Sequence, residues 1–127
     1  MIILDASVLI AHLDAQDRHH ERASALLQTV AAELFGASPI TLAEALVGPA
    51  RLGTLDRAEA AIATLGVAAI ALTEAAPARL ASLRHTTRLR MPDCCVLLAT
   101  ETARGALATF DESLAEAATR LGLAVHV

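Results

Sequence analysis

The chain has 127 residues and a formal net charge of −4, with 55% hydrophobic and 19% charged residues. This length suits a single domain over residues 1–127, and the apolar content excludes a disordered chain. A net acidic chain is excluded as a general nucleic-acid binder, because attraction to phosphates dominates that affinity. Only Phe35 and Phe110 are aromatic, which argues against bases stacking on aromatic platforms.

Two further features bear on the location of the protein. No apolar run approaches the roughly 18 residues needed to cross a membrane, and the first residues lack the basic segment of a signal peptide. Cys94 and Cys95 are adjacent, so they cannot join distant segments, and no zinc-ligand spacing is present. We therefore expect a cytoplasmic protein without membrane contacts.

The first half of the chain predicts one strand followed mainly by helices. Ile2–Leu4 is a short apolar run typical of a buried parallel strand, and Val8–Leu13 is a helical run. Residues 19–35 carry apolar side chains at helical spacing, with Gly36 as the stop. Residues 38–40 form a short link, and the sequence leaves open whether a second strand ends there. Two glycine-terminated helices follow, over Thr41–Leu52 and Leu55–Leu65.

The second half alternates strands and helices more evenly. Its predicted strands are Val67–Leu72, Ala106–Phe110 and Leu123–Val127, and its predicted helices are residues 74–86, 92–103 and 112–121. A polar loop over residues 87–91 precedes Pro92, which suits the first turn of a helix. Because strands alternate with helices, we predict an α/β fold in which a parallel sheet carries helices on both faces.

Four carboxylates fall where such a fold brings side chains together. Asp5 ends the first predicted strand, and Asp111 directly follows the predicted strand Ala106–Phe110. Glu44 and Asp93 lie in the first turns of predicted helices. In open α/β sheets, ligands bind beyond the carboxyl ends of the strands, and all four positions belong to that rim. We expect the four acids to converge there.

Convergence of four acids requires compensation of their charge. Two carboxylates about 5 Å apart repel by about 3 kcal/mol at an effective dielectric constant near 20. Either some of them take up protons, or a metal ion lies among them. All-oxygen ligation suits Mg²⁺ or Mn²⁺ rather than zinc, and such an ion promotes phosphodiester hydrolysis.

Each acid also has an ordinary structural interpretation. Asp5 and Asp111 suit helix N-caps, Asp93 suits the first turn of a helix, and Thr41 with Glu44 matches a capping box. A single acid therefore decides nothing. The prediction rests on all four lying at one rim.

Four segments of the chain resemble the motifs of the PIN-domain family, in order and over the whole length. They are MIILDASVLI at residues 1–10, SPITLAEA at 38–45, LRMPD at 89–93 and ATFD at 108–111. Within the family, the chain resembles VapC-type toxins of bacterial toxin–antitoxin pairs. It departs from the commonest pattern at Cys94 and Cys95, where small residues such as Ala are usual.

This resemblance implies a Mg²⁺-dependent endoribonuclease, with Mn²⁺ as a substitute, that hydrolyses the phosphodiester bonds of RNA. It also implies a homodimer and a small antitoxin that inserts a segment into the active-site groove. The positions that match the family's metal-binding and catalytic acids are Asp5, Glu44, Asp93 and Asp111. The positions that match its supporting hydroxyls, which hydrogen-bond to the acids, are Ser7 and Thr109.

An acidic site still has to hold RNA, and the sequence offers arginines close to it. Residues 75–92 contain four arginines and no acid. Arg88 and Arg90 lie just before Asp93, and Arg suits bidentate phosphate contacts, so these two are the predicted RNA-binding residues. We expect Arg79 and Arg84 to lie on a solvated helix face.

Two other functions remain open at this stage. A PIN-like module that only binds a partner protein would need no catalysis, although retention of all four acids argues against it. A DNA nuclease would share the metal chemistry, and RNA and DNA substrates compared side by side would distinguish it. A phospho-aspartate signalling domain fits poorly, because such domains need an active-site Lys and the chain has none.

Overall fold

The computed structural model describes residues 1–127 and is built on one sheet of five strands. The order of the strands across the sheet is β3-β2-β1-β4-β5, and every neighbouring pair is parallel. The predicted α/β class is therefore confirmed. The strands are β1 (Ile2–Leu4), β2 (Phe35–Ala37), β3 (Val67–Ala69), β4 (Ala106–Ala108) and β5 (Val125–His126).

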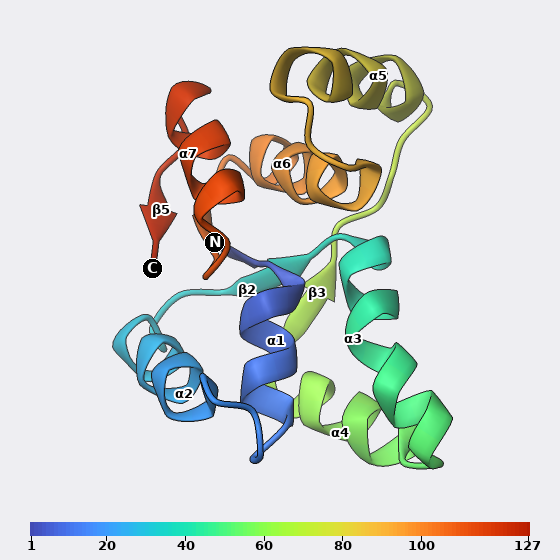
Figure 1. Ribbon diagram of the computed structural model, residues 1–127, viewed down its shortest axis with the longest axis vertical. Helices are drawn as coiled ribbons and strands as arrows, with labels where there is room; N and C mark the ends of the chain where they lie inside the picture. The colour runs from blue at the N-terminus through green and yellow to red at the C-terminus, as the bar shows by residue number, and fades with distance from the viewer.

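Helices cover both faces of this sheet, as Figure 1 shows, with α5, α6 and α7 above it and α1 to α4 below it. None of them has the length and apolar character that a membrane crossing demands. They are α1 (Ala6–Leu13), α2 (His20–Thr29), α3 (Pro39–Leu52), α4 (Leu55–Leu65), α5 (Ala76–Thr87), α6 (Met91–Ala103) and α7 (Glu112–Arg120).

The central strand β1 separates two hydrophobic cores. Successive side chains of a strand point to opposite faces, so Ile2 and Leu4 enter one core and Ile3 enters the other. The first core includes Val8 and Leu27 from α1 and α2, and the second includes side chains of α5, α6 and α7. All three β1 residues are buried, which explains the continuous apolar run at the start of the sequence.

The structure corrects the prediction for residues 19–37. Helix α2 ends at Thr29, and the chain then turns into strand β2. Gly36, predicted as a helix stop, lies in the middle of this buried strand. A Cβ atom there would lie 3.0 Å from the tips of neighbouring side chains, including that of Ile3. Leu34 has helical spacing but is 72% exposed, so its place in the apolar pattern was misleading.

The start of α3 also differs from the prediction. Ser38 is the N-cap, and its Oγ accepts the N–H of Ile40 at 3.3 Å. The helix therefore begins at Pro39, a residue suited to a first turn, and the capping box predicted at Thr41 and Glu44 is wrong. Glu44 consequently lies in the second turn. The Thr41 hydroxyl is buried without a hydrogen-bond partner.

The remaining boundaries shift by a few residues. Strands β3, β4 and β5 are shorter than the runs predicted from residues 67–72, 106–110 and 123–127, because regular pairing with the neighbouring strand covers only part of each run. Helix α5 begins later than predicted, and α6 begins one residue earlier, at Met91. Arg79 on α5 does not face solvent freely, because it forms a bidentate ion pair with Glu101 of α6.

Candidate active site

Asp5 occupies the carboxyl end of the central strand. It stands at the N-cap position of α1, but its side chain makes no capping hydrogen bond. Instead, its Oδ2 atom accepts two hydrogen bonds of 2.8 Å, from the hydroxyls of Ser7 and Thr109. Only 6% of Asp5 is exposed. The carboxylate is therefore held in one orientation by groups from α1 and from the end of β4.

The same hydroxyls fix the segment that carries the next acid. Thr109 Oγ1 accepts the N–H of Asp111 at 3.0 Å, and Ser7 Oγ accepts the N–H of Phe110 at 3.1 Å. The backbone N–H of Asp5 also donates to the carbonyl of Ala108 at 3.0 Å. The loop from β4 to α7 is thus tied to the first residues of α1.

Asp111 begins α7 as its N-cap. Its Oδ1 accepts the N–H of Leu114 at 3.0 Å, so one oxygen has a structural role. Oδ2 has no such bond, and the residue is exposed. Capping and a role at the site are therefore compatible for this residue.

Asp93 and Glu44 lie within the electrostatic field of the other acids. Burial raises the pKa of the Asp93 carboxyl, and the charges of Asp5 and Asp111 raise it further. Burial also raises the pKa of Glu44, with a second contribution from the charge of Asp5. The charges of three acids from separate segments thus reach the Asp93 carboxyl and disfavour its ionisation, so the structure brings the four acids together.

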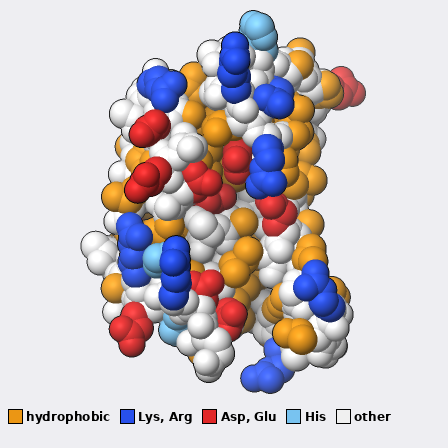
Figure 2. All heavy atoms as spheres, in the orientation of Figure 1, with side chains coloured by type: hydrophobic (Ala, Val, Ile, Leu, Met, Phe, Trp, Pro, Cys, Tyr) orange, Lys and Arg blue, Asp and Glu red, His pale blue; other side chains and the backbone are white.

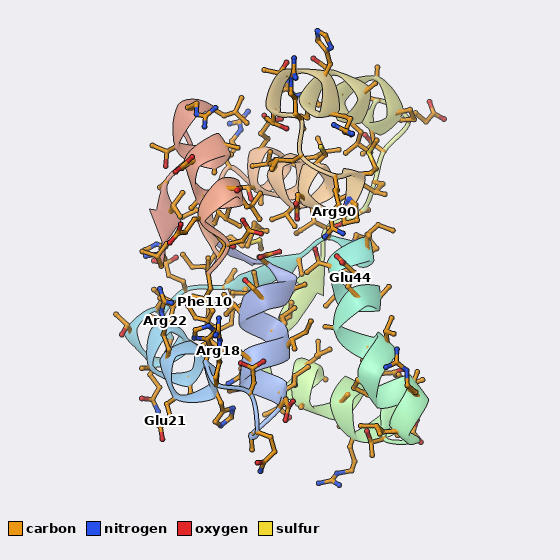
Figure 3. The ribbon with its side chains drawn as sticks, in the orientation of Figure 1. Arg18, Glu21, Arg22, Glu44, Arg90 and Phe110 are labelled. Carbon is orange, nitrogen blue, oxygen red and sulfur yellow. The ribbon has the colours of Figure 1, made fainter.

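Arg90 provides the opposing charge at this site. It is the residue immediately before α6, and its guanidinium lowers the pKa values of both Asp93 and Glu44. Figure 3 shows Arg90 and Glu44 next to each other, at the start of α6 and on α3. Acidic side chains gather on this face in Figure 2, with basic side chains on both sides of them.

Arg88 lies in different surroundings, although it is only two residues away. It ends α5 in the left-handed conformation, with φ of 61°. Together with Arg84 and His85 it lines an open depression of about 720 Å³ between α5 and the start of α6. Its charge is not among those that act on Glu44 and Asp93. Arg90, but not Arg88, therefore adjoins the acids.

The donor chemistry of the site fits a hard divalent cation. The acids supply only carboxylate oxygens, which suit Mg²⁺ or Mn²⁺, and the mutual charge effects on Asp93 and Glu44 are those that a cation would relieve. No three His, Cys, Asp or Glu side chains, however, are already arranged as a closed metal-binding group. An ion at this site would require side-chain adjustment around the fixed carboxylate of Asp5.

One pair of residues near the site was not predicted from the sequence. The guanidinium of Arg22, on α2, lies over the ring of Phe110, with Cζ 4.2 Å from the ring centroid. Figure 3 places both residues on the same face as Glu44 and Arg90. Phe110 lies in the ATFD segment, but Arg22 is far from it in the chain and belongs to none of the four motif segments, so nothing in the sequence pointed to their contact.

Solved structures support the same fold. The crystal structure of FitAcB from Neisseria gonorrhoeae is 25% identical, with a TM-score of 0.76, and the match covers 100% of this chain and 97% of that chain. A toxin–antitoxin complex from Klebsiella pneumoniae is 24% identical, with a TM-score of 0.69 and 87% coverage of each chain. Mycobacterium tuberculosis VapC20, a sarcin–ricin loop cleaving toxin, is 20% identical, with a TM-score of 0.74 and coverage of 92% and 95%. The last two are too dissimilar in sequence to support more than the fold.

Family membership rests on the sequence itself. No curated protein matches the chain. The PIN domain family, in contrast, matches residues 2–120, which include all four acids and both supporting hydroxyls. The structural neighbours are proteins of the VapC and FitB toxin–antitoxin type. The chain therefore belongs to the PIN-domain family.

Proposed function

We propose that this protein is a divalent-metal-dependent endoribonuclease and the toxin of a type II toxin–antitoxin pair. The observation that carries the proposal is the gathering of the carboxylates at one rim of the sheet, where the charge of Asp5 raises the pKa values of both Glu44 and Asp93. Such a cluster is costly to maintain without a cation, so its presence in a PIN domain favours metal-dependent phosphodiester hydrolysis. The neighbouring toxin–antitoxin structures support an antitoxin as partner.

The chain's own residues divide the work of the reaction. Asp5 and Asp93 would hold Mg²⁺, which supplies charge neutralisation and polarisation of the scissile phosphate. Glu44, whose pKa is raised, is suited to accept a proton from the attacking water, and Asp111 orients that water with its free oxygen. Ser7 and Thr109 keep Asp5 in place. Arg90 contacts a phosphate of the strand.

The test uses purified protein, labelled single-stranded RNA, and the matching DNA. Cleavage of RNA is expected with Mg²⁺ or Mn²⁺ and is expected to stop when EDTA removes the metal. Asp5→Asn should abolish cleavage and weaken Mg²⁺ binding in calorimetry, with an unchanged circular-dichroism spectrum. Asp56→Asn is the matched control, because Asp56 is an exposed acid in the first turn of α4.

Three results would contradict the proposal. Full activity of Asp5→Asn would remove Asp5 from the site. Cleavage of DNA alone would point to a DNA nuclease. Absence of cleavage by the wild-type protein with either metal, together with tight binding of a co-expressed antitoxin, would leave a PIN-like module that acts only through protein contacts.

A further inference from the structure

We propose that Arg22, whose guanidinium lies over the ring of Phe110, is the stacking platform for one base of the RNA strand, in a pocket that Asp111 of the acidic site also lines. This inference rests on the proposed ribonuclease function and adds the recognition of a base to it. The pocket has a volume of about 220 Å³. It is lined by Arg22, Phe110, Asp111, Glu112, Ala115 and Val127.

The platform is rigid because its lower layer is fixed. The backbone N–H of Phe110 is bound by Ser7, and the Phe110 ring packs against the core below the sheet. The ring of His19 lies 5.7 Å from that of Phe110 in a tilted arrangement and supports it from the side. The Arg22 guanidinium lies over the ring, with Cζ 4.2 Å from the ring centroid, so the aromatic face beneath it restricts where the guanidinium can lie.

The upper layer is free to receive a base. Arg22 is exposed and is absent from the ion pairs of the structure, so its outer face has no competing partner. Bases of single-stranded RNA stack on Arg guanidinium planes as well as on aromatic rings. The scarcity of aromatic residues therefore does not prevent stacking here, because a single ring supports an arginine that makes the contact.

The acids of the pocket favour a base over a phosphate. Asp111 and Glu112 would repel an anion, but their oxygens accept N–H groups from the edge of a base. The Asp111 Oδ1 atom already accepts the N–H of Leu114, whereas the exposed Glu112 side chain has no hydrogen bond to another residue. We therefore assign Glu112 as the acceptor. Guanine offers it two adjacent N–H donors.

The position of the pocket relates it to cleavage. Asp111 lines the pocket, and its charge also acts on Asp93, so the two regions share a residue. In Figure 3 the Arg22–Phe110 pair and Arg90 lie on opposite sides of the start of α1. A strand that contacts both would cross the acids between them. The stacked base would then lie next to the scissile phosphate and influence where the strand is cut.

Binding by the Asp5→Asn protein tests the platform without cleavage. The probe is a short oligouridylate with one 2-aminopurine, whose fluorescence changes on stacking and is free of protein background because the chain has no Trp or Tyr. Arg22→Lys keeps the charge but removes the plane. We expect it to weaken binding by about 5- to 150-fold and to abolish the fluorescence change, as Arg22→Ala does.

The control is Arg120→Lys, an exposed arginine of α7 that pairs with Glu116 outside the pocket and should leave both signals unchanged. If Arg22→Lys binds like the parent with the same fluorescence change, the platform is disproved. Cleavage by proteins with Asp5 intact is measured separately. Absence of cleavage by the wild-type protein would therefore overturn the proposed nuclease function. Unchanged RNA binding and fluorescence in Arg22→Lys would overturn only the proposed stacking platform.

A second comparison tests the assignment of Glu112. An oligouridylate with one guanine should bind more tightly than the same strand with inosine, which lacks the exocyclic amino group. Glu112→Ala should remove most of this difference while keeping the 2-aminopurine signal. Equal affinity of the parent for the two strands, or an undiminished difference in Glu112→Ala, would disprove recognition by Glu112.

Discussion

At the scale of single residues, Thr109 connects two of the acids. Its fully buried hydroxyl donates to Asp5 and accepts the backbone N–H of Asp111. Each of these groups would lose a partner if the hydroxyl were removed, and an unsatisfied buried polar group costs about 1–3 kcal/mol. One oxygen atom thus links both acids, alongside the bonds that Ser7 makes to Asp5 and to the N–H of Phe110.

Thr109→Val, which keeps the shape but removes the hydroxyl, is therefore expected to lower both stability and RNA cleavage. We expect a loss of about 1–3 kcal/mol in urea unfolding and a cleavage rate reduced at least tenfold. Thr100→Val is the control, because the equally buried Thr100 hydroxyl bonds only to a carbonyl of its own helix. A similar loss of cleavage in both variants would show that Thr109 has no special role.

His12 makes stability depend on pH. Burial lowers the pKa of His12 below its usual 6.5, and the charge of neighbouring His20 lowers it further. The unfolded chain therefore binds a proton at this residue more readily than the folded chain does. Stability should be complete above about pH 6.5 and should fall as the pH decreases through that value towards the folded pKa.

His12→Gln should flatten this dependence in urea midpoints measured between pH 5 and pH 8. The glutamine can still bond to Ser24, the present partner of the His12 ring. An unchanged pH profile in the variant would assign the dependence to other groups.

At the scale of elements, the cap of α3 shows how local chemistry positions a site residue. The buried Ser38 accepts the N–H of Ile40, whereas Thr54 precedes α4 without a side-chain capping bond. Ser38→Ala should therefore destabilise the protein by about 1 kcal/mol, and Thr54→Ala should have a much smaller effect. Thermal unfolding of the two variants provides the comparison. Equal effects would mean that the Ser38 bond contributes nothing.

Elements with strong local signals could be predicted from the sequence. Helix α4 has the predicted bounds Leu55–Leu65, because Gly66, with φ of 70°, ends it in a conformation that favours glycine. Strand β2 was not located from the sequence, which left open only a second strand ending at residues 38–40, since Phe35–Ala37 lacks the continuous run of large apolar residues that marks β1. Its conformation comes from pairing with β1 and β3, on either side of it.

At the site, too, features with a local sequence signal could be predicted, and features that depend on packing between distant elements could not. The rim positions of Asp5, Glu44, Asp93 and Asp111 follow from the alternation of strands and helices, and in the structure the charges of the other three act on Asp93. Their roles in metal binding and catalysis stay predictions. The different surroundings of Arg88 and Arg90, and the contact of Arg22 with Phe110, depend on how distant helices pack. No local pattern encodes such contacts.

At the scale of the whole molecule, Gly105 allows the central strands to pair. A Cβ atom on Gly105 would lie 2.3 Å from the carbonyl oxygen of Met1. This oxygen accepts the N–H of Ala106 where β1 meets β4. Only a residue without a side chain fits here, so the sheet that separates the two cores depends on it.

Gly105→Ala should therefore destabilise the whole fold by about 1–3 kcal/mol, as in other cases of overpacking. Gly48→Ala is the contrasting case, because Gly48 lies within α3 and a Cβ atom there would meet nothing beyond its chain neighbours, one of which is Pro49. Its effect should be much smaller, because the gain from replacing a helical glycine is opposed by crowding of the new Cβ against the ring of Pro49. Urea unfolding of both variants provides the comparison. A neutral Gly105→Ala would show that the strands tolerate displacement.

The two adjacent cysteines give this protein a built-in reporter of motion. Cys94 and Cys95 directly follow Asp93 in α6; both are buried, and burial raises their thiol pKa values. Thiolate is the reactive form, so a modifying reagent can attack only molecules in which this helix has transiently opened. The labelling rate therefore measures how often the helix that carries Asp93 opens, and a ligand that binds Asp93 should slow it without any engineered label.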